Sequence, residues 1–297
     1  MHSTISYRRV ILRECSTEEK DFLDLYYIFR ATLKPDLSFR EFRAYYYSAK
    51  LEYIDITFIL AGDREGRGDR GNRIIGFCSA AFYSADAASS KTAAGGSKAD
   101  AGRSKTVIGR AATGILEAYR GRALPKWRLY CKYIRYWGRH PFRSIILSAY
   151  VANPLIYAMI CKYTGIAYPH PASPVPAAII QLKDELLRGQ RIGIPADNAF
   201  VVPIHFSVAL GEKERQRINT SRDPSVGYFV KINPKFLQQH GVLVIIPVNL
   251  KNILWSSWKF LYYKILRLGV RVLQPGVRAG LGFPGGSPLG EGEINFN

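Results

Sequence analysis

The chain has few acidic residues, few cysteines and no long apolar segment. Among its 297 residues, Asp and Glu number 23 against 42 Lys and Arg, so the formal net charge is +19. Lys or Arg interrupts the apolar runs before they reach the roughly 20 residues that a membrane-spanning helix needs. The first residues also lack the basic head, apolar region and cleavage site of a secretory signal. We therefore expect a cytoplasmic protein, with attachment to a membrane surface left open.

Cysteine is too sparse to build a disulfide framework or a metal site. The four cysteines, at positions 15, 78, 131 and 161, form no CxxC pair and have no histidine at metal-ligand spacing. We expect reduced, mostly buried thiols and no bound metal. Because 47% of the residues are hydrophobic, the chain is too apolar to be disordered as a whole.

Acidic residues are missing from two long stretches that contain many basic residues. One stretch lies between Glu117 and Asp184, and the other lies between Asp223 and Glu291. Such a field attracts anions, which include cofactor phosphates, an acidic carrier protein, nucleic acid and anionic lipid. No RNP-like, helix-turn-helix or zinc motif is present, so nucleic acid ranks below a membrane surface.

Apolar periodicity predicts a mixed α/β protein with a twisted sheet and flanking helices. Residues 1–175 are expected to form a core with a flexible insertion at 85–105. Residues 176–297 are expected to add strands and a basic amphipathic helix that complete or extend the sheet. Within the strand expected at 106–119, Gly109 and Gly114 indicate a bulge or a close backbone approach. The expected strands are 7–15, 55–63, 73–84, 106–119, 143–150, 198–210, 227–233 and 241–248, and the expected helices are 16–33, 38–53, 124–140, 153–165, 176–189 and 249–269.

The segment EAYRGRAL (117–124) places a glycine, small residues and two arginines between a strand and a helix. The first backbone N–H groups of a helix have no internal partners, and Gly121 would let them approach an anion closely. The pattern is typical of a phosphate-binding turn, although it contains neither GxxxxGK nor GxGxxG. An ordinary loop with solvated arginines is the alternative.

The order of elements resembles that of the GNAT acyltransferase superfamily over roughly residues 11–166. AYRGRA is similar to the coenzyme-binding turn Q/R-x-x-G-x-G/A and matches it at Gly121 and Ala123, whereas Ala118 replaces the first residue. NPLIYAMICKYTGI resembles the segment N-x-x-A…Y-x-x-x-G-F, with Asn153 and Gly165 at the matching positions.

This resemblance implies an N-acyltransferase that moves an acyl group from a coenzyme A thioester, or from an acidic acyl carrier protein, to an amine. It also implies that two parallel strands diverge and that the acyl arm inserts between them. The residues implied to contact the donor are Tyr119, Arg120, Gly121, Arg122, Ala123, Leu124 and Asn153.

Direct attack by an amine on a thioester needs a general base and a proton donor for the leaving thiolate. Glu117 is the candidate base, directly or through water, and a structural ion pair with an arginine is the interpretation that competes with this role. The family's usual tyrosine, four residues before the glycine, is replaced by Cys161. We therefore expect the acid among Tyr157, Cys161 and Tyr163, with core packing as the alternative for each.

The last helical pattern places Leu254, Trp258, Leu261, Ile265 and Leu268 on one face, with lysines and arginines largely on the others. This pattern is typical of a basic helix that lies on an anionic membrane. Docking of the same apolar face on the protein's own sheet is the interpretation that we favour. The alternative function is accordingly a non-catalytic GNAT-fold protein that binds an anionic membrane or another polyanion.

Overall fold

A computed structural model describes residues 4–13, 19–33, 35, 37–47, 51–62, 73–84, 106–120, 126–189, 200–204, 206 and 210–273. Inside these ranges, the side chains at 4, 19, 126, 127, 189, 263, 264 and 266–273 are not described. The expected insertion at 85–105 lies outside the described residues.

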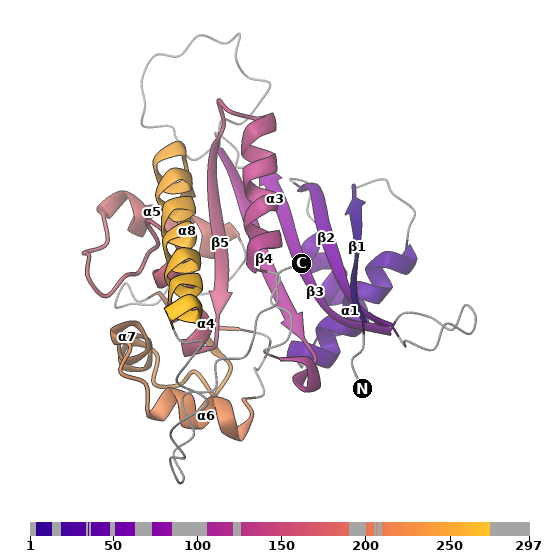
Figure 1. The fold of residues 1–297 in the computed structure, drawn as a ribbon. Coiled ribbons are helices and arrows are strands. Elements are labelled where there is room, and N and C mark those ends of the chain that lie inside the picture. The colour runs from indigo at the N-terminus through magenta and orange to yellow at the C-terminus, as the bar shows by residue number, and fades with distance from the viewer. Residues whose placement is uncertain are drawn as a thin grey trace, which may run out of the picture.

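The described strands form one mixed sheet in the order β1-β2-β3-β4-β5-β7-β6. The pair β4–β5 is parallel, and the other neighbouring pairs are antiparallel (Figure 1). Strands β6 and β7, from the C-terminal part of the chain, therefore extend the sheet that the N-terminal strands begin. The bounds are β1 Thr4–Leu12, β2 Leu51–Gly62, β3 Arg73–Ser84, β4 Thr106–Ile115, β5 Ser144–Val151, β6 Val201–Pro203 and β7 His240–Val248.

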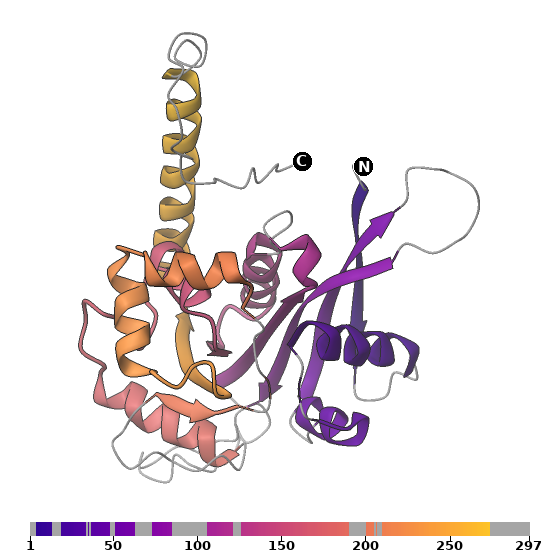
Figure 2. The same ribbon diagram turned by 90° about the horizontal axis from the view of Figure 1, so that it is seen from below.

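Helices cover both faces of this sheet. Helices α3, α4 and α8 lie on one face and α1, α2 and α5 on the other (Figures 1 and 2). Helices α6 and α7 pack beside α4 through a small apolar cluster. The bounds are α1 Glu19–Leu33, α2 Phe39–Tyr46, η3 Glu117–Tyr119, α3 Lys126–Arg139, α4 Pro154–Tyr163, α5 Ala177–Gly189, α6 Glu212–Asn219, α7 Pro224–Ile232 and α8 Leu250–Leu273.

Two glycines of β4 allow the helices to approach the strand closely, as the sequence predicts. A Cβ at Gly109 would lie 2.5 Å from Tyr133 of α3, and a Cβ at Gly114 would collide with Thr32 of α1. The register between β3 and β4 is continuous, so close approach rather than a bulge explains these glycines.

A charged group is buried between the sheet and α3. Asp55 of β2 and Lys132 of α3 are almost inaccessible and form an ion pair, and Lys132 also donates to Thr57 Oγ1 at 2.8 Å. Arg9 of β1 pairs with the same carboxylate. Lys132 belongs to the stretch between Glu117 and Asp184 that contains no acidic residue, but a carboxylate 77 residues away in sequence lies beneath the helix and neutralises it.

Four expected elements differ from the structure. The expected strand 106–119 ends at Ile115, and residues 117–119 form η3. Residues 227–233 were expected as a strand, but 227–232 belong to helix α7 and Asn233 caps its end. The first turn of α7 is fixed by Pro224 and by Asp223, which accepts a hydrogen bond from Ser225 N at 2.8 Å. The expected helix 38–53 ends at Tyr46, because β2 begins at Leu51. Only residues 201–203 of the expected strand 198–210 are described as a strand.

Helix α8 docks through a polar side chain, which the sequence did not predict. Asn252 is buried; its amide donates to Ile166 O and Pro247 O, and its oxygen accepts from Ile166 N, at 2.7 to 2.9 Å. Ser256 Oγ accepts a hydrogen bond from Gly165 N at 3.0 Å. The expected docking of the apolar face is wrong, because its described members remain exposed: Leu254, Trp258, Leu261 and Ile265. The side chain of Leu268 lies outside the description.

We expect Asn252→Ala to lower the free energy of unfolding by about 2 to 3 kcal/mol, because it leaves two carbonyls and one amide without their buried partner. Urea unfolding would measure this change. The matched variant Asn252→Asp keeps the acceptor but loses the two donated bonds, so it should also be destabilised. Equal stability of Asn252→Ala and the wild type would contradict the proposed anchoring of α8.

Candidate functional site

The two parallel strands in the middle of the sheet separate before they end. Pairing of β4 with β5 runs from Thr106–Ser144 to Arg110–Ser148. Beyond these residues β4 continues to Ile115 paired only with β3, and β5 continues to Val151 paired only with β7. Figure 1 shows the C-terminal ends of the two arrows apart. Beyond Arg110 and Ser148, the backbone N–H and C=O groups on the facing edges of β4 and β5 make no hydrogen bonds between these two strands. The divergence of two parallel strands agrees with the expectation from the sequence.

Two helices begin on the side where the strands diverge. Helix α3 follows β4 and precedes the parallel strand β5, so its first turn lies toward the C-terminal end of β4. Helix α4 follows β5 directly, and Asn153 caps it by accepting a hydrogen bond from Leu155 N at 2.9 Å. Unpaired N–H groups and the positive ends of two helix dipoles thus point toward the C-terminal ends of the diverging strands.

The segment after β4 is described only as far as Arg120. Glu117 is exposed and begins the short helix η3, and its Oε1 would lie 3.1 Å from a Cβ at Gly211. Tyr119 is partly buried. Arg120 Nη1 donates to Glu214 Oε2 of α6 at 2.9 Å, so this arginine fastens the segment to α6. The other expected donor contacts lie outside the described residues: Gly121, Arg122, Ala123 and Leu124.

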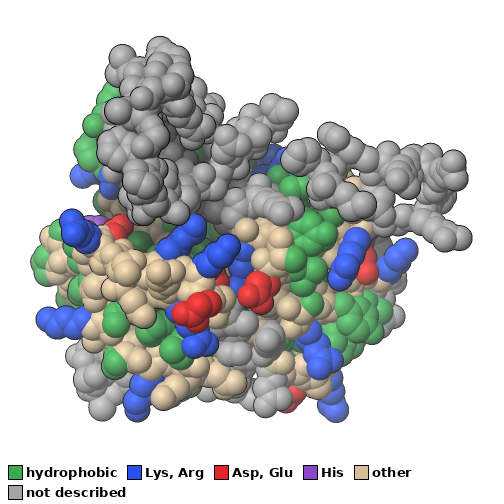
Figure 3. All heavy atoms as spheres, turned by 60° about the horizontal axis from the view of Figure 1, so that its bottom comes forward, with side chains coloured by type: hydrophobic (Ala, Val, Ile, Leu, Met, Phe, Trp, Pro, Cys, Tyr) green, Lys and Arg blue, Asp and Glu red, His purple; other side chains and the backbone are tan. Residues whose placement is uncertain are grey.

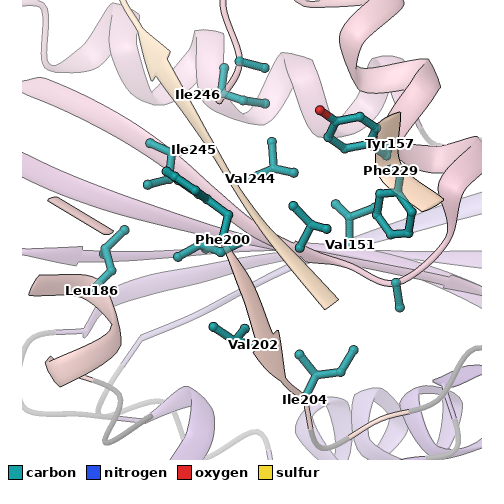
Figure 4. Close-up of a cluster of buried hydrophobic side chains, with 14 of the residues drawn as sticks. Val151, Tyr157, Leu186, Phe200, Val202, Ile204, Phe229, Val244, Ile245 and Ile246 are labelled. Atoms are coloured by element: carbon teal, nitrogen blue, oxygen red, sulfur yellow. The ribbon is translucent and has the colours of Figure 1, made fainter. Parts of the chain in front are cut away.

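The three candidate acids lie along α4 in different surroundings. Tyr157 is fully buried against Phe229, and its hydroxyl donates to Pro169 O at 2.8 Å (Figure 4). Burial raises the pKa of Tyr157 well above its ordinary value. Cys161 is also buried, and burial raises the pKa of its thiol. Tyr163 is less buried, near the end of α4, with its ring 6.3 Å from that of Phe260.

Distance along the helix separates these candidates further. At about 1.5 Å per residue, Tyr157 lies about 6 Å along the axis from the Asn153 cap, Cys161 about 12 Å and Tyr163 about 15 Å. Tyr157 is therefore nearest the diverging strands, although its hydroxyl already has an acceptor. The structure brings Glu117, Arg120 and Asn153 to the ends of β4 and β5, and it spreads the three candidate acids along α4.

Arg110 is a candidate that the sequence analysis missed. It occupies the last position of β4 that pairs with β5. Its guanidinium lies 4.5 and 4.9 Å from the ring centres of Tyr45 and Tyr83, and Nη1 donates to Tyr45 O at 2.8 Å. Its Nε is buried without a hydrogen-bond partner, and no carboxylate of the described residues forms an ion pair with it. The sequence offered one indication of this role: Arg110 is the single basic residue among the small and apolar residues of the strand expected at 106–119.

The described part of the chain contains no candidate metal site. No cluster of three or more His, Cys, Asp or Glu side chains occurs there that could hold a metal ion. The described thiols, Cys78, Cys131 and Cys161, are free, and two of them are buried, as expected. At the ends of β4 and β5 the described residues include hydrogen-bond donors, the exposed carboxylate of Glu117 and the arginines Arg110 and Arg120.

No protein-family model matches the chain, and no curated protein matches it in sequence. Among solved structures, it is similar to Arabidopsis thaliana NAA60 in complex with acetyl-CoA, with 13% identity and a TM-score of 0.35 over 84% of this chain and 99% of that chain. NAA60 from the same plant in complex with a bisubstrate analogue gives the same identity and TM-score over 83% and 100%. The observed strand order, the divergence of β4 and β5 and the helices that follow them show a GNAT-like fold.

Proposed function

We propose that the protein is an N-acyltransferase that takes its acyl group from a coenzyme A thioester. The observation that carries this proposal is the separation of β4 from β5 beyond Arg110 and Ser148, on the side where α3 and α4 begin. An acyl-pantetheine arm can hydrogen-bond to the free strand edge of β4 while its diphosphate interacts with helix N–H groups. The complexes of NAA60 with acetyl-CoA and with a bisubstrate analogue agree with this choice of donor.

The proposal extends to roles for individual residues. We propose that Arg122 and the backbone of 119–124 hold the diphosphate, since Arg120 is engaged by Glu214. Asn153 orders the first turn of α4 and presents its N–H groups. A backbone N–H of β4 polarises the thioester carbonyl, and Glu117 accepts the amine proton through water.

We propose Tyr157, Cys161 and Tyr163 as the candidate proton donors for the departing thiolate. Tyr157 is nearest the diverging strands, but a hydroxyl that is buried, has a raised pKa and donates to Pro169 O is a weak acid. Cys161 and Tyr163 are farther along α4. Water can protonate a thiolate, so replacement of any one of these side chains should reduce turnover less than loss of the donor site.

Arg110 suggests the chemistry of the acceptor. Its side chain lies on the side of the sheet that α1 and α2 cover, where it touches Tyr45 and Tyr83. A buried Nε–H without a partner favours an acceptor that carries an anionic group near its amine. We therefore propose an amine with a nearby carboxylate or phosphate as the acceptor class.

Thermal protection by the donor tests this proposal. Acetyl-CoA or a longer acyl-CoA should raise the Tm of the wild type in a concentration-dependent way, and Arg122→Glu should abolish that shift. Arg40→Glu, a matched charge reversal at an exposed position of α2, should leave the shift unchanged. Acylated carrier protein tested in parallel distinguishes the two donor forms. If neither thioester protects the wild type, an acyl donor is ruled out, and the non-catalytic alternative is favoured.

A further inference from the structure

The side of α8 that points away from the protein is almost entirely apolar. Its large side chains are between 48% and 61% exposed. At 100° per residue, these side chains fall within one arc of the helix. In Figure 2 the helix extends beyond the other described helices and strands. We call this surface the α8 apolar face, and its members are Leu250, Leu254, Trp255, Trp258, Leu261, Tyr262 and Ile265.

Docking of α8 leaves this surface uncovered because the opposite side of the helix makes the contacts. Asn252 and Ser256 bind backbone groups of the segment after α4, and Lys259 Nζ donates to Thr164 O at 3.1 Å. Tyr130 Oη of α3 donates to Ile253 O at 2.8 Å. A helix that buries its amides and hydroxyls and exposes its tryptophans has the reverse of the usual amphipathic arrangement. An exposed apolar patch of this kind indicates an interaction surface.

Basic side chains accompany this surface. Between Asp223 and Glu291 the chain has no acidic residue, and Lys251 is exposed within the same arc of α8. Lys162, at the end of α4, is exposed close to where α8 docks. Figure 3 shows hydrophobic side chains along the outer flank of the projection at the upper left, with basic side chains beside them.

We propose that the α8 apolar face inserts into the surface of an anionic lipid bilayer. Trp and Tyr side chains favour the boundary between headgroups and acyl chains, and neighbouring lysines and arginines interact with anionic headgroups. A second copy of the chain is a poorer occupant, because pairing two such faces would bring like charges together in a protein of net charge +19. No helix in the described ranges is long and apolar enough to cross the bilayer. This proposal does not depend on acyl transfer.

Binding to vesicles of defined composition tests the proposal. The full chain should co-sediment with vesicles of phosphatidylcholine and phosphatidylserine, and much less with phosphatidylcholine alone or at high salt. Leu254→Glu with Trp258→Glu should weaken binding by about tenfold or more, because it removes two inserted side chains and adds repulsion from the lipid. Both residues are exposed, so the far-UV circular dichroism should not change.

A matched variant and a second readout make the result decisive. Phe142→Glu adds one negative charge, against two in the double variant, at an aromatic residue that is fully exposed in the turn between α3 and β5, and it should bind as the wild type does. Brominated lipids should quench Trp255 and Trp258 in a chain whose other two tryptophans, Trp127 and Trp137, are replaced by phenylalanine. Equal binding of the wild type and the Leu254→Glu, Trp258→Glu variant would overturn the proposal. So would a stable dimer that this variant dissociates, with no vesicle binding by the wild type.

Discussion

Lys132→Met is expected to lower the free energy of unfolding by about 3 to 5 kcal/mol, because it breaks a buried ion pair and leaves the buried Asp55 carboxylate with one close cation instead of two. The carboxylate of Asp55 would stay between the sheet and α3, with Arg9 as its remaining close ion-pair partner and Arg135 3.9 Å away. The hydrogen bond from Lys132 to Thr57 Oγ1 would also be lost. Urea unfolding monitored by far-UV circular dichroism measures the change.

The double variant Asp55→Leu, Lys132→Met shows whether the stability lost in Lys132→Met comes from the buried charge of Asp55 or from lost packing. It removes both buried charges, and Arg9 can turn to water because its side chain is already 38% exposed. We therefore expect the double variant to be more stable than Lys132→Met alone. If both variants lose the same free energy, the cost comes from packing and the charge argument is wrong.

Acid unfolding gives an independent measure of the same group. Burial alone would raise the pKa of Asp55, but the hydrogen bonds from Arg9 and the charge of Lys132 outweigh it, and the net pKa lies below the ordinary value. A carboxyl with a lowered folded pKa adds stability above its unfolded pKa of about 3.9, and this contribution is lost as the pH falls through the folded pKa. In Lys132→Met the folded pKa rises toward the unfolded value, so the loss should be smaller and should be complete at a higher pH.

Much of the sheet follows from local sequence. Runs such as 73–84 and 241–248 are long and apolar enough to define β3 and β7. The two glycines of β4 correctly indicate close contact with helices. Helix α7 was mistaken for a strand because nine residues are too few to reveal their period, although Asp223 and Pro224 form a recognisable helix start.

What the sequence could not reveal concerns contacts between distant segments. An amphipathic pattern shows which face of α8 is apolar, but the choice of buried face depends on the acceptors and donors that Asn252 finds at Ile166 and Pro247. The burial of Lys132 depends on Asp55, which the fold brings beneath it. Arg110 can be recognised as a candidate site residue only when the pairing of β4 with β5 is known to end there.

Gly114→Ala is expected to lower the free energy of unfolding by about 2 to 3 kcal/mol, because a methyl group has no room between β4 and α1. Its Cβ would lie 2.6 Å from a ring carbon of Phe77 and closer still to Thr32 Oγ1. Neither neighbour can yield easily: Phe77 is fully buried, and the Thr32 hydroxyl donates to Ile28 O at 2.7 Å. Urea unfolding measures the loss.

Gly138→Ala is the matched control, because it lies in α3 with no atom within 4 Å of the added Cβ. It should be neutral or stabilising by up to about 1 kcal/mol. Adding Thr32→Ala to Gly114→Ala removes one of the two obstacles and should recover part of the loss. Since Gly114 lies in the part of β4 that has left β5, a shift of this strand should also weaken acyl-CoA protection of the folded protein. A Gly114→Ala protein with wild-type stability would contradict the close packing of α1 on the strand that we propose binds the donor.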